Sequence, residues 1–153
     1  MRHMQMRTWA EISLKNLEHN YKTMKARLRD GTRFLGVVKA DAYGHGAVRT
    51  ARLLEELGCE YLGVASLDEA LILREAGVAL PVLVMSYTPP ELTAELMENG
   101  LTQTIYSGDL AERFSRAAAS LGGSLKAHLK VDTGMGRLGF VCGRGRDPEE
   151  DML

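Results

Sequence analysis

The sequence contains no long apolar run and very little cysteine. No stretch of the 153 residues approaches the ~18 apolar residues of a membrane-spanning helix, and the start MRHMQMRTWAEISL lacks the apolar core of a signal peptide. Its two cysteines, Cys59 and Cys142, stand in unrelated surroundings without a CxxC spacing, which disfavours a metal site or a disulfide framework. We therefore expect a cytoplasmic protein that holds no metal and does not bind membranes.

An excess of charge of one sign is also lacking. Nineteen Lys and Arg residues against 20 Asp and Glu residues leave a formal net charge of -1 at pH 7. A chain this close to neutrality creates no large field to attract nucleic acid or an anionic surface. Because 45% of the residues are hydrophobic, the chain can bury a core. We expect one folded unit over residues 1–153, with a small, roughly neutral molecule as its partner.

Short apolar runs alternate with helical patterns along the chain. The predicted strands lie at residues 7–12, 34–38, 61–65, 81–85, 101–106 and 124–131. The predicted helices run from Ser13 to about Gly31, from Ala47 to Leu57, from a capping box of Ser66 and Glu69 to about Gly77, onward from Pro89 and Pro90, and from Asp109 to about Leu121. Buried strands separated by helices favour an α/β fold with a parallel sheet, either a (β/α)8 barrel or an open doubly wound sheet.

Two features bear on that choice. In the last predicted strand, apolar residues such as Ala127 and Leu129 share one face, while polar residues such as His128 and Lys130 share the other. A polar inner face at a barrel mouth would explain this alternation. A complete barrel needs eight strands and typically ~250 residues, whereas five βα units are counted here. Residues 141–153 are charged and contain Gly and Pro, which predicts an irregular tail.

The segment VVKADAYGHG at residues 37–46 carries the candidate chemistry. Lys39 directly follows a predicted buried strand, where catalytic groups lie in α/β folds, and Tyr43 comes four residues later. A lysine held against an apolar strand loses its proton more readily, which suits Schiff-base chemistry with an aldehyde. Gly44 and Gly46 would let the backbone approach a ligand such as a phosphate. Taken alone, the segment is also compatible with a solvated strand end and ordinary turn glycines.

A family resemblance favours the chemical interpretation. VKADAYGHG resembles the pyridoxal-phosphate (PLP) attachment motif of alanine racemases, and LKVDTGMGRLGF at 129–140 resembles a second motif of that family. The motifs occur in the right order, and the resemblance extends from about Arg7 to Phe140. It implies a partial (β/α)8 TIM-type barrel of PLP fold type III, with about five βα units and without the family's C-terminal β domain.

The resemblance also implies roles for individual residues. Lys39 would bind the cofactor and exchange the substrate's α-proton on one face, and Tyr43 would contact the cofactor phosphate. Arg137 would lie near the PLP phenolic oxygen and the substrate carboxylate, and Lys130, often carbamylated in the family, would support Arg137. Without the resemblance, Tyr43 could simply pack its ring, and Arg137 and Lys130 could be surface charges. His45 is expected to make local hydrogen bonds.

The implied activity is the PLP-dependent interconversion of L-alanine and D-alanine through an aldimine and an α-carbanion, which supplies D-alanine for peptidoglycan. A homodimer is expected for the complete enzyme, because the family takes its opposite-face base from the partner subunit. The 153 residues are expected to be an incomplete, weakly active or inactive fragment. Two alternatives stay open: a racemase for another amino acid, and a noncatalytic PLP-binding or interaction protein.

Overall fold

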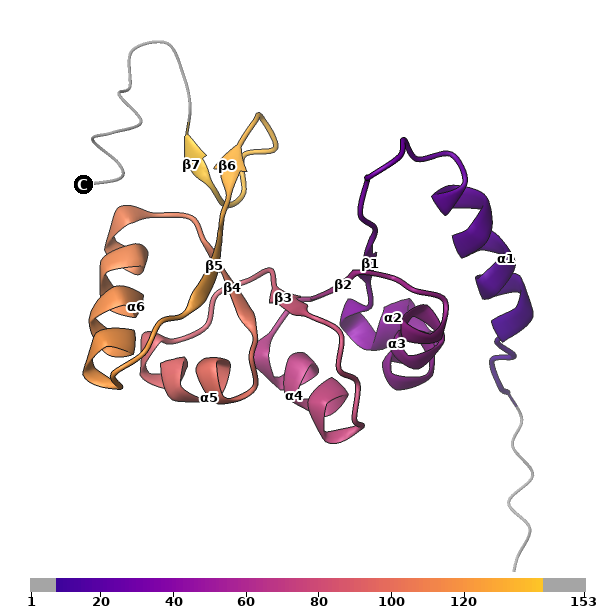
Figure 1. The fold of residues 1–153 in the computed structure, drawn as a ribbon, viewed down its shortest axis with the longest axis horizontal. Helices are drawn as coiled ribbons and strands as arrows, with labels where there is room; N and C mark the ends of the chain where they lie inside the picture. Colours follow the sequence, from indigo (N-terminus) through magenta and orange to yellow (C-terminus); the bar gives the residue numbers. More distant parts are fainter. Residues whose placement is uncertain (1–7, 142–153) are drawn as a thin grey trace, which may run out of the picture.

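Five short parallel strands form one sheet in the computed structural model, which describes residues 8–141 (Figure 1). The strands are β1 (Leu35–Val37), β2 (Tyr61–Val64), β3 (Val82–Val84), β4 (Thr102–Ile105) and β5 (Lys126–Leu129). They pair in the order β1-β2-β3-β4-β5, and every pairing is parallel. Each strand therefore lies beside the next one along the chain. This is the order of a barrel wall, because the strand order of a doubly wound sheet reverses part-way across it.

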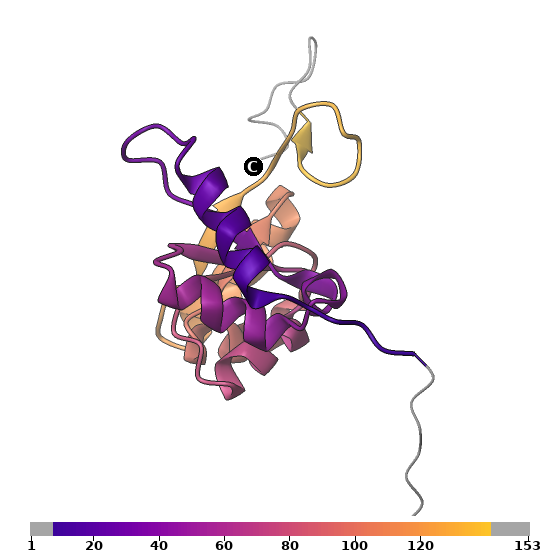
Figure 2. The same cartoon turned by 90° about the vertical axis from the view of Figure 1, so that its right-hand side faces the viewer.

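One helix precedes the first strand, and the other helices lie between successive strands of the sheet. They are α1 (Leu14–Lys25), α2 (Lys39–Gly44), α3 (Ala47–Glu56), α4 (Leu67–Glu75), the short 3-10 helix η1 (Pro90–Leu92), α5 (Thr93–Glu98) and α6 (Gly108–Ser120). Figure 1 shows α3 to α6 along the same face of the curved sheet, and Figure 2 shows α1 running across the end of the molecule at which β1 lies. Helices gathered on one face of a parallel sheet again indicate a barrel wall.

Serine side chains begin three of these helices, and two of these serines, Ser13 and Ser66, were predicted from the sequence. Ser13, Ser66 and Ser107 each accept a hydrogen bond from the backbone N–H three residues later, which satisfies one donor that the helix leaves unpaired. Helix α1 ends at Lys25, earlier than the predicted end near Gly31. The chain tightens there into turns with hydrogen bonds between residues three apart, so the helical spacing of apolar residues continues beyond the helix itself.

The core lies between the sheet and the helices. Its largest fully buried side chains come from the strands and from the helices that cover them. They include Leu62 and Val64 of β2, Val82 and Val84 of β3, Leu73 of α4 and Leu96 of α5. Gly36 in β1 leaves room for this packing, because a Cβ at this position would lie 2.6 Å from Leu54 Cδ1 of α3 and the Leu54 side chain would have to shift. Helix α3 therefore lies directly on β1, and it fixes the strand that leads to Lys39.

The structure corrects the sequence predictions at both ends. Residues 8–12 form no strand, and Trp9 is 72% exposed, because no strand within residues 8–141 lies beside this segment to supply ladder hydrogen bonds. The strand predicted at 124–131 is divided into β5 and the short β6 (Val131–Asp132), which pairs in parallel with β7 (Phe140–Val141). Val141 is therefore in a strand, and the rest of the predicted irregular tail lies outside the described residues.

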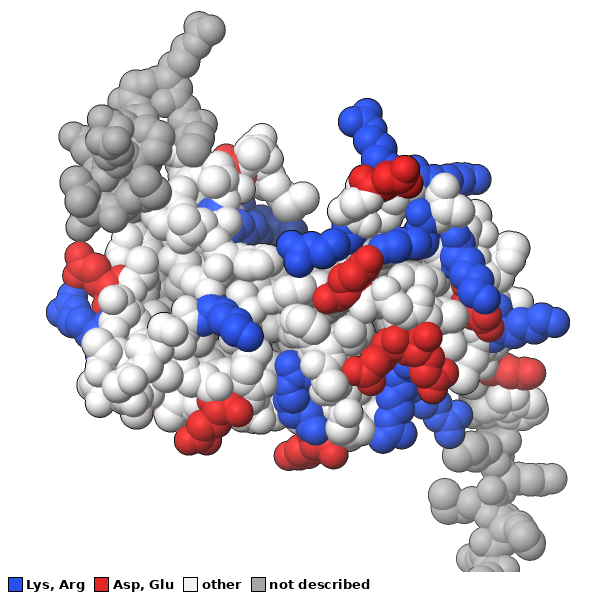
Figure 3. Space-filling model, in the orientation of Figure 1, with Lys and Arg blue, Asp and Glu red and all other residues white. Residues whose placement is uncertain are grey.

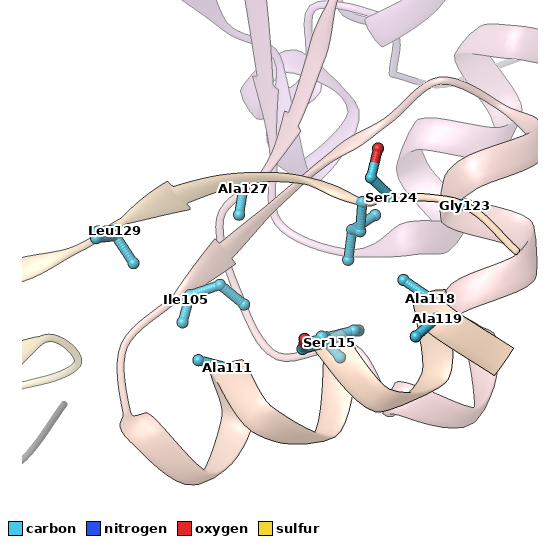
Figure 4. Close-up of a pocket in the computed structure, with 11 residues that line it drawn as sticks. Ile105, Ala111, Ser115, Ala118, Ala119, Gly123, Ser124, Ala127 and Leu129 are labelled. Carbon is cyan, nitrogen blue, oxygen red and sulfur yellow. The ribbon is translucent and has the colours of Figure 1, made fainter. Parts of the chain in front are cut away.

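An apolar groove of about 370 Å³ runs between β5 and α6 (Figure 4). Leu125, Ala127 and Leu129 line it from the last strand segment and Phe114 lines it from α6, so the predicted apolar face of that strand is confirmed. On the opposite face His128 lies against the ring of Tyr61, with the ring centroids 5.8 Å apart. Within residues 8–141, β5 pairs only with β4 and is an edge of the sheet.

We expect this edge to cause self-association of the 153-residue chain, because an exposed strand edge beside apolar side chains is a template for pairing. Leu129 is 65% exposed, so Leu129→Lys should weaken association while changing the free energy of unfolding by no more than about 0.5 kcal/mol. Sedimentation equilibrium would measure the self-association of each variant. Ile72→Lys, which alters a 51% exposed apolar residue on α4, is the control. Equal association of the two variants would contradict the prediction.

Candidate functional site

Lys39 lies immediately after β1, at the carboxyl end of the strand. The preceding residue, Val38, is buried, and its N–H donates a 2.8 Å hydrogen bond to the Gly63 carbonyl at the neighbouring strand β2. Lys39 itself is half-buried. Among residues 8–141 no carboxylate forms an ion pair with its ammonium group. The strand therefore holds the backbone of Lys39 in place and leaves its amine available to a ligand.

The chain then enters a left-handed turn. Residues 40–43, none of them glycine, have φ values of 50, 53, 52 and 54°, so α2 is not an ordinary right-handed helix. A left-handed conformation costs roughly 1–2 kcal/mol per residue, because Cβ approaches the following carbonyl oxygen. A turn of this kind persists only where its surroundings determine it, and such strain is concentrated at functional sites. The segment after Lys39 is thus held in a conformation that its own sequence disfavours.

Hydrogen bonds within the segment support this turn. The Ala42 N–H donates to the Val38 carbonyl at 2.9 Å, and Asp41 Oδ1 accepts from the Ala47 N–H at 2.6 Å, which ties the turn to the start of α3. His45 Nδ1 lies 2.8 Å from the Ala42 carbonyl, so the local role predicted for His45 is confirmed. Asp41 acts as a backbone acceptor here, a role that sequence reasoning missed.

A second support comes from the next βα unit. Glu69 Oε1 accepts a 2.8 Å hydrogen bond from the Ala40 N–H, and Oε2 accepts a 2.7 Å hydrogen bond from the Ala65 N–H. Ser66 Oγ in turn accepts from the Glu69 N–H at 3.4 Å. The predicted capping box is therefore present in part: the serine caps α4, but the glutamate binds Ala65 and reaches across to the turn. No sequence signal identified this second contact, which joins residues 29 positions apart.

Tyr43 is the last residue of the left-handed turn, and it is 62% exposed. Its exposure leaves the phenol ring free of the core. Lys39 and Tyr43 are therefore presented by the same short segment, as the sequence suggested, with the amine at its start and the phenol at its end. The segment continues through Gly44 and Gly46, which have φ values of 84 and 89° and nothing within 4 Å of the position of a Cβ.

The other two candidate residues lie beyond β5. Lys130 is half-buried, its N–H donates to the Ile105 carbonyl at 2.8 Å, and its carbonyl accepts from the Phe140 N–H at 2.8 Å. Arg137 is exposed on the loop between β6 and β7, where its guanidinium group donates to Met135 Sδ at 2.9 Å. In the part of the chain that the structure describes, no hydrogen bond or ion pair joins Lys130 to Arg137.

Asp132 organises the loop that carries Arg137. Its Oδ1 accepts hydrogen bonds from the Gly136 N–H at 3.0 Å and from the Gly134 N–H at 2.9 Å. These two donors hold the pKa of the Asp132 carboxyl below its usual value of 3.8. Gly139 has a φ of 140°, and a Cβ there would lie 2.4 Å from the Asp132 backbone nitrogen, so glycine is required where β7 meets β6.

The two pairs of candidate residues share one edge of the sheet. Lys39 follows β1 and Lys130 follows β5, and the carboxyl ends of parallel strands lie at the same edge. Four strand spacings of about 4.8 Å separate β1 from β5, or roughly 19 Å along the sheet. The structure thus places Lys39 and Tyr43 on one segment after β1, and Lys130 and Arg137 on another segment after β5, and it shows no direct contact between the two segments' candidate residues within residues 8–141.

The described part of the chain contains neither a candidate metal site nor a membrane-spanning helix. Among residues 8–141, no group of three or more His, Cys, Asp or Glu side chains is placed to hold a metal ion. Cys59 is a buried free thiol, and Cys142 lies outside the described residues. No helix of the described part is both long enough and apolar enough to cross a bilayer. On the face shown in Figure 3, acidic and basic side chains are intermixed.

Comparison with known proteins identifies the family. The sequence model of the alanine racemase N-terminal domain matches residues 12–144, which is most of the chain. The chain belongs to the alanine racemase family. It is 50% identical over 131 residues to the alanine racemase of Desulfovibrio desulfuricans, a match that covers 86% of this chain and 35% of that relative. The motif resemblance noted in the sequence is confirmed.

Solved structures agree with this assignment. An alanine racemase from Clostridium difficile 630 superposes with a TM-score of 0.85 at 43% identity, over 90% of this chain and 36% of that one. A histidine racemase from Leuconostoc mesenteroides superposes with a TM-score of 0.80 at 31% identity, over 92% of this chain and 36% of that one. The chain therefore has the barrel fold of the alanine racemase family and spans about a third of the length of these relatives.

Relief of strain in the turn should be measurable. Ala40 is exposed with positive φ, so Ala40→Gly should raise the free energy of unfolding by about 0.5–1 kcal/mol, because glycine adopts this conformation without a Cβ clash. The same change in the right-handed helix α6, Ala117→Gly, should lower it by about 1 kcal/mol. Urea unfolding of both variants measures the difference. Equal losses in the two variants would show that the turn is not left-handed in solution.

The loop that carries Arg137 should depend on the ionisation of Asp132. Because the folded-state pKa is depressed, the carboxylate stabilises the loop above pH 3.8 and loses this effect as the pH falls below that value. We expect amide exchange at Gly134 and Gly136, corrected for its intrinsic pH dependence, to stay constant from pH 7 to about pH 4 and to accelerate below pH 3.8. Asp132→Asn keeps one acceptor oxygen without a titrating charge, and should remove this acceleration. If the native chain and Asp132→Asn showed the same dependence of amide exchange on pH, the carboxylate of Asp132 would not be the group that stabilises the loop.

Proposed function

We propose that this chain is the cofactor-attachment part of a PLP-dependent alanine racemase, which interconverts L-alanine and D-alanine. The observation that carries the proposal is the placement of Lys39 directly after β1, on a strained turn, in a chain of the alanine racemase family. The proposal includes the cytoplasmic location, the homodimer and the supply of D-alanine for peptidoglycan that the resemblance implies.

The described residues fit PLP chemically. The cofactor carries an aldehyde, a phosphate and a phenolic oxygen, and the chain offers the Lys39 amine, the exposed Tyr43 phenol and the exposed Arg137 guanidinium group. Gly44 and Gly46 leave open space beside the turn, where a phosphate could approach the backbone. When bound, PLP withdraws electrons from the α-carbon of an attached amino acid and so acidifies its α-proton.

Each residue then has a defined task. Lys39 Nζ would hold the cofactor through its aldehyde, and the same amine would take and return the α-proton of a bound amino acid on one face. The Tyr43 hydroxyl orients the phosphate by donating a hydrogen bond. The Arg137 guanidinium group would donate to the phenolic oxygen of the bound cofactor and attract the substrate carboxylate. Lys130, if carbamylated, places a negative charge near Arg137 and steadies it.

Inversion requires a second proton-transfer group on the opposite face of the substrate. No residue to which we assign a role within residues 8–141 supplies this second group. We assign the group to the partner subunit of the complete homodimer. We infer that the 153-residue chain exchanges the α-proton through Lys39 better than it inverts the α-carbon. Solvent deuterium uptake without a matching appearance of D-alanine would support this division, whereas equal rates of both would overturn it.

Attachment at Lys39 is the direct test of the proposal. After incubation with PLP and reduction with borohydride, peptide mapping should find the pyridoxyl group on the peptide that contains Lys39. Lys39→Ala should lose this label. Lys126→Ala, which removes an exposed lysine from β5, should retain it. A label on other lysines, with Lys39 unmodified in the native chain, would overturn the assignment.

The amino-acid substrate can be tested in the same preparation. A structurally similar protein is named as a histidine racemase, so deuterium uptake at the α-carbon should be compared for L-alanine and L-histidine. We expect faster uptake with L-alanine. Faster uptake with L-histidine would favour a racemase for another amino acid. A label at Lys39 without uptake for either amino acid would favour a noncatalytic PLP-binding protein.

A further inference from the structure

We propose that Glu69 is a positioning residue for Lys39: from the neighbouring βα unit, it holds the left-handed turn in the conformation that presents the Lys39 amine. The inference rests on the proposed function of Lys39 as the point of cofactor attachment. Glu69 lies on α4, outside both sequence motifs that suggested the function. It is not assigned any contact with substrate or cofactor.

A single carboxylate joins the ends of two adjacent strands. Ala40, whose N–H donates to Glu69 Oε1 at 2.8 Å, is the first left-handed residue and directly follows Lys39. Ala65, whose N–H donates to Oε2 at 2.7 Å, directly follows β2. β1 and β2 are neighbours in the sheet, with Val37 paired to Gly63. Glu69 therefore continues the connection between these strands beyond the point where their ladder ends.

Helix capping alone does not explain this arrangement. In an ordinary capping box the glutamate needs one oxygen, which accepts from the N–H of the N-cap residue. Here one oxygen serves the residue before Ser66 and the other serves a residue in a different βα unit. Both partners are donors, so the site requires two acceptors at once. An ionised carboxylate supplies two, whereas the amide of glutamine supplies one oxygen and would turn an NH2 group toward an N–H donor.

Loss of Glu69 should act on the turn first and on Lys39 through it. Ala40 is exposed and keeps its positive φ against a local preference for the right-handed conformation. Without an acceptor for its N–H, the first peptide of the turn can rotate, and this peptide follows the Lys39 α-carbon. The amine would then spend less time in the direction that the folded turn gives it.

The experiment uses the 153-residue chain and two readouts. Amide hydrogen exchange, without cofactor, reports the protection of Ala40 and Ala65. The rate of borohydride-trapped labelling of Lys39, at a PLP concentration below saturation, reports the presentation of its amine. Glu69→Ala removes both acceptors and Glu69→Gln keeps one. Ser66→Ala is the matched control, since it removes the cap of the same helix and leaves the carboxylate in place.

In Glu69→Ala we expect exchange at Ala40 to accelerate at least tenfold and labelling of Lys39 to slow at least fivefold. Glu69→Gln should protect one of the two amides and show an intermediate labelling rate. Ser66→Ala should loosen the start of α4 without changing Ala40 exchange or the labelling rate. If Glu69→Ala does not fold, Glu69→Gln carries the same comparison, because it keeps the size of the side chain.

Two results would overturn the proposal. One is unchanged Ala40 exchange in the Glu69 variants. The other is a wild-type labelling rate in variants whose Ala40 exchange is faster, which would make Glu69 a structural residue without influence on Lys39. A native chain that takes no label at Lys39 would instead reject the proposed function, and with it any role of Glu69 in presenting the amine.

Discussion

Four consecutive residues after Lys39 adopt a conformation that L-amino acids avoid, and the candidate site depends on the contacts that keep them there. These contacts follow from the sheet. Parallel pairing of β1 with β2 brings the two strand ends together, and α4 begins beside them with Glu69 in its first turn. The cost of the turn is thus offset by bonds to a neighbouring βα unit, which links the geometry at Lys39 to correct assembly of the barrel wall.

Two aspartates have the same task in the two halves of the site. Asp41 accepts a backbone hydrogen bond that joins the Lys39 turn to α3, and Asp132 accepts two that fold the loop carrying Arg137. Neither aspartate is needed as an acid or base in the proposed chemistry. Both motifs therefore combine a residue proposed to touch the cofactor with a carboxylate that shapes the backbone around it.

The sequence predicted the elements of the fold better than the details of the site. Buried strands of branched residues and serine caps are local signals, so the five strands of the sheet and the start of α4 could be found. The left-handed turn could not, because an Ala-rich segment locally prefers a right-handed helix and only tertiary bonds override that preference. The contact of Glu69 with Ala40 spans 29 positions and has no local signature. Residues 8–12 show the opposite error, since their alternation suggested a strand for which residues 8–141 provide no neighbouring strand.

The central claim is that the turn beside Lys39 is left-handed before any cofactor binds. The intraresidue contact between the amide proton and the α-proton measures this directly, because the two protons lie closer together at positive φ than in a right-handed helix. Nuclear Overhauser spectra of the free 153-residue chain should show strong intraresidue cross-peaks at all four residues of the turn, 40–43, and weaker ones through α6. Cross-peaks of equal, helix-like intensity in both segments would contradict the account.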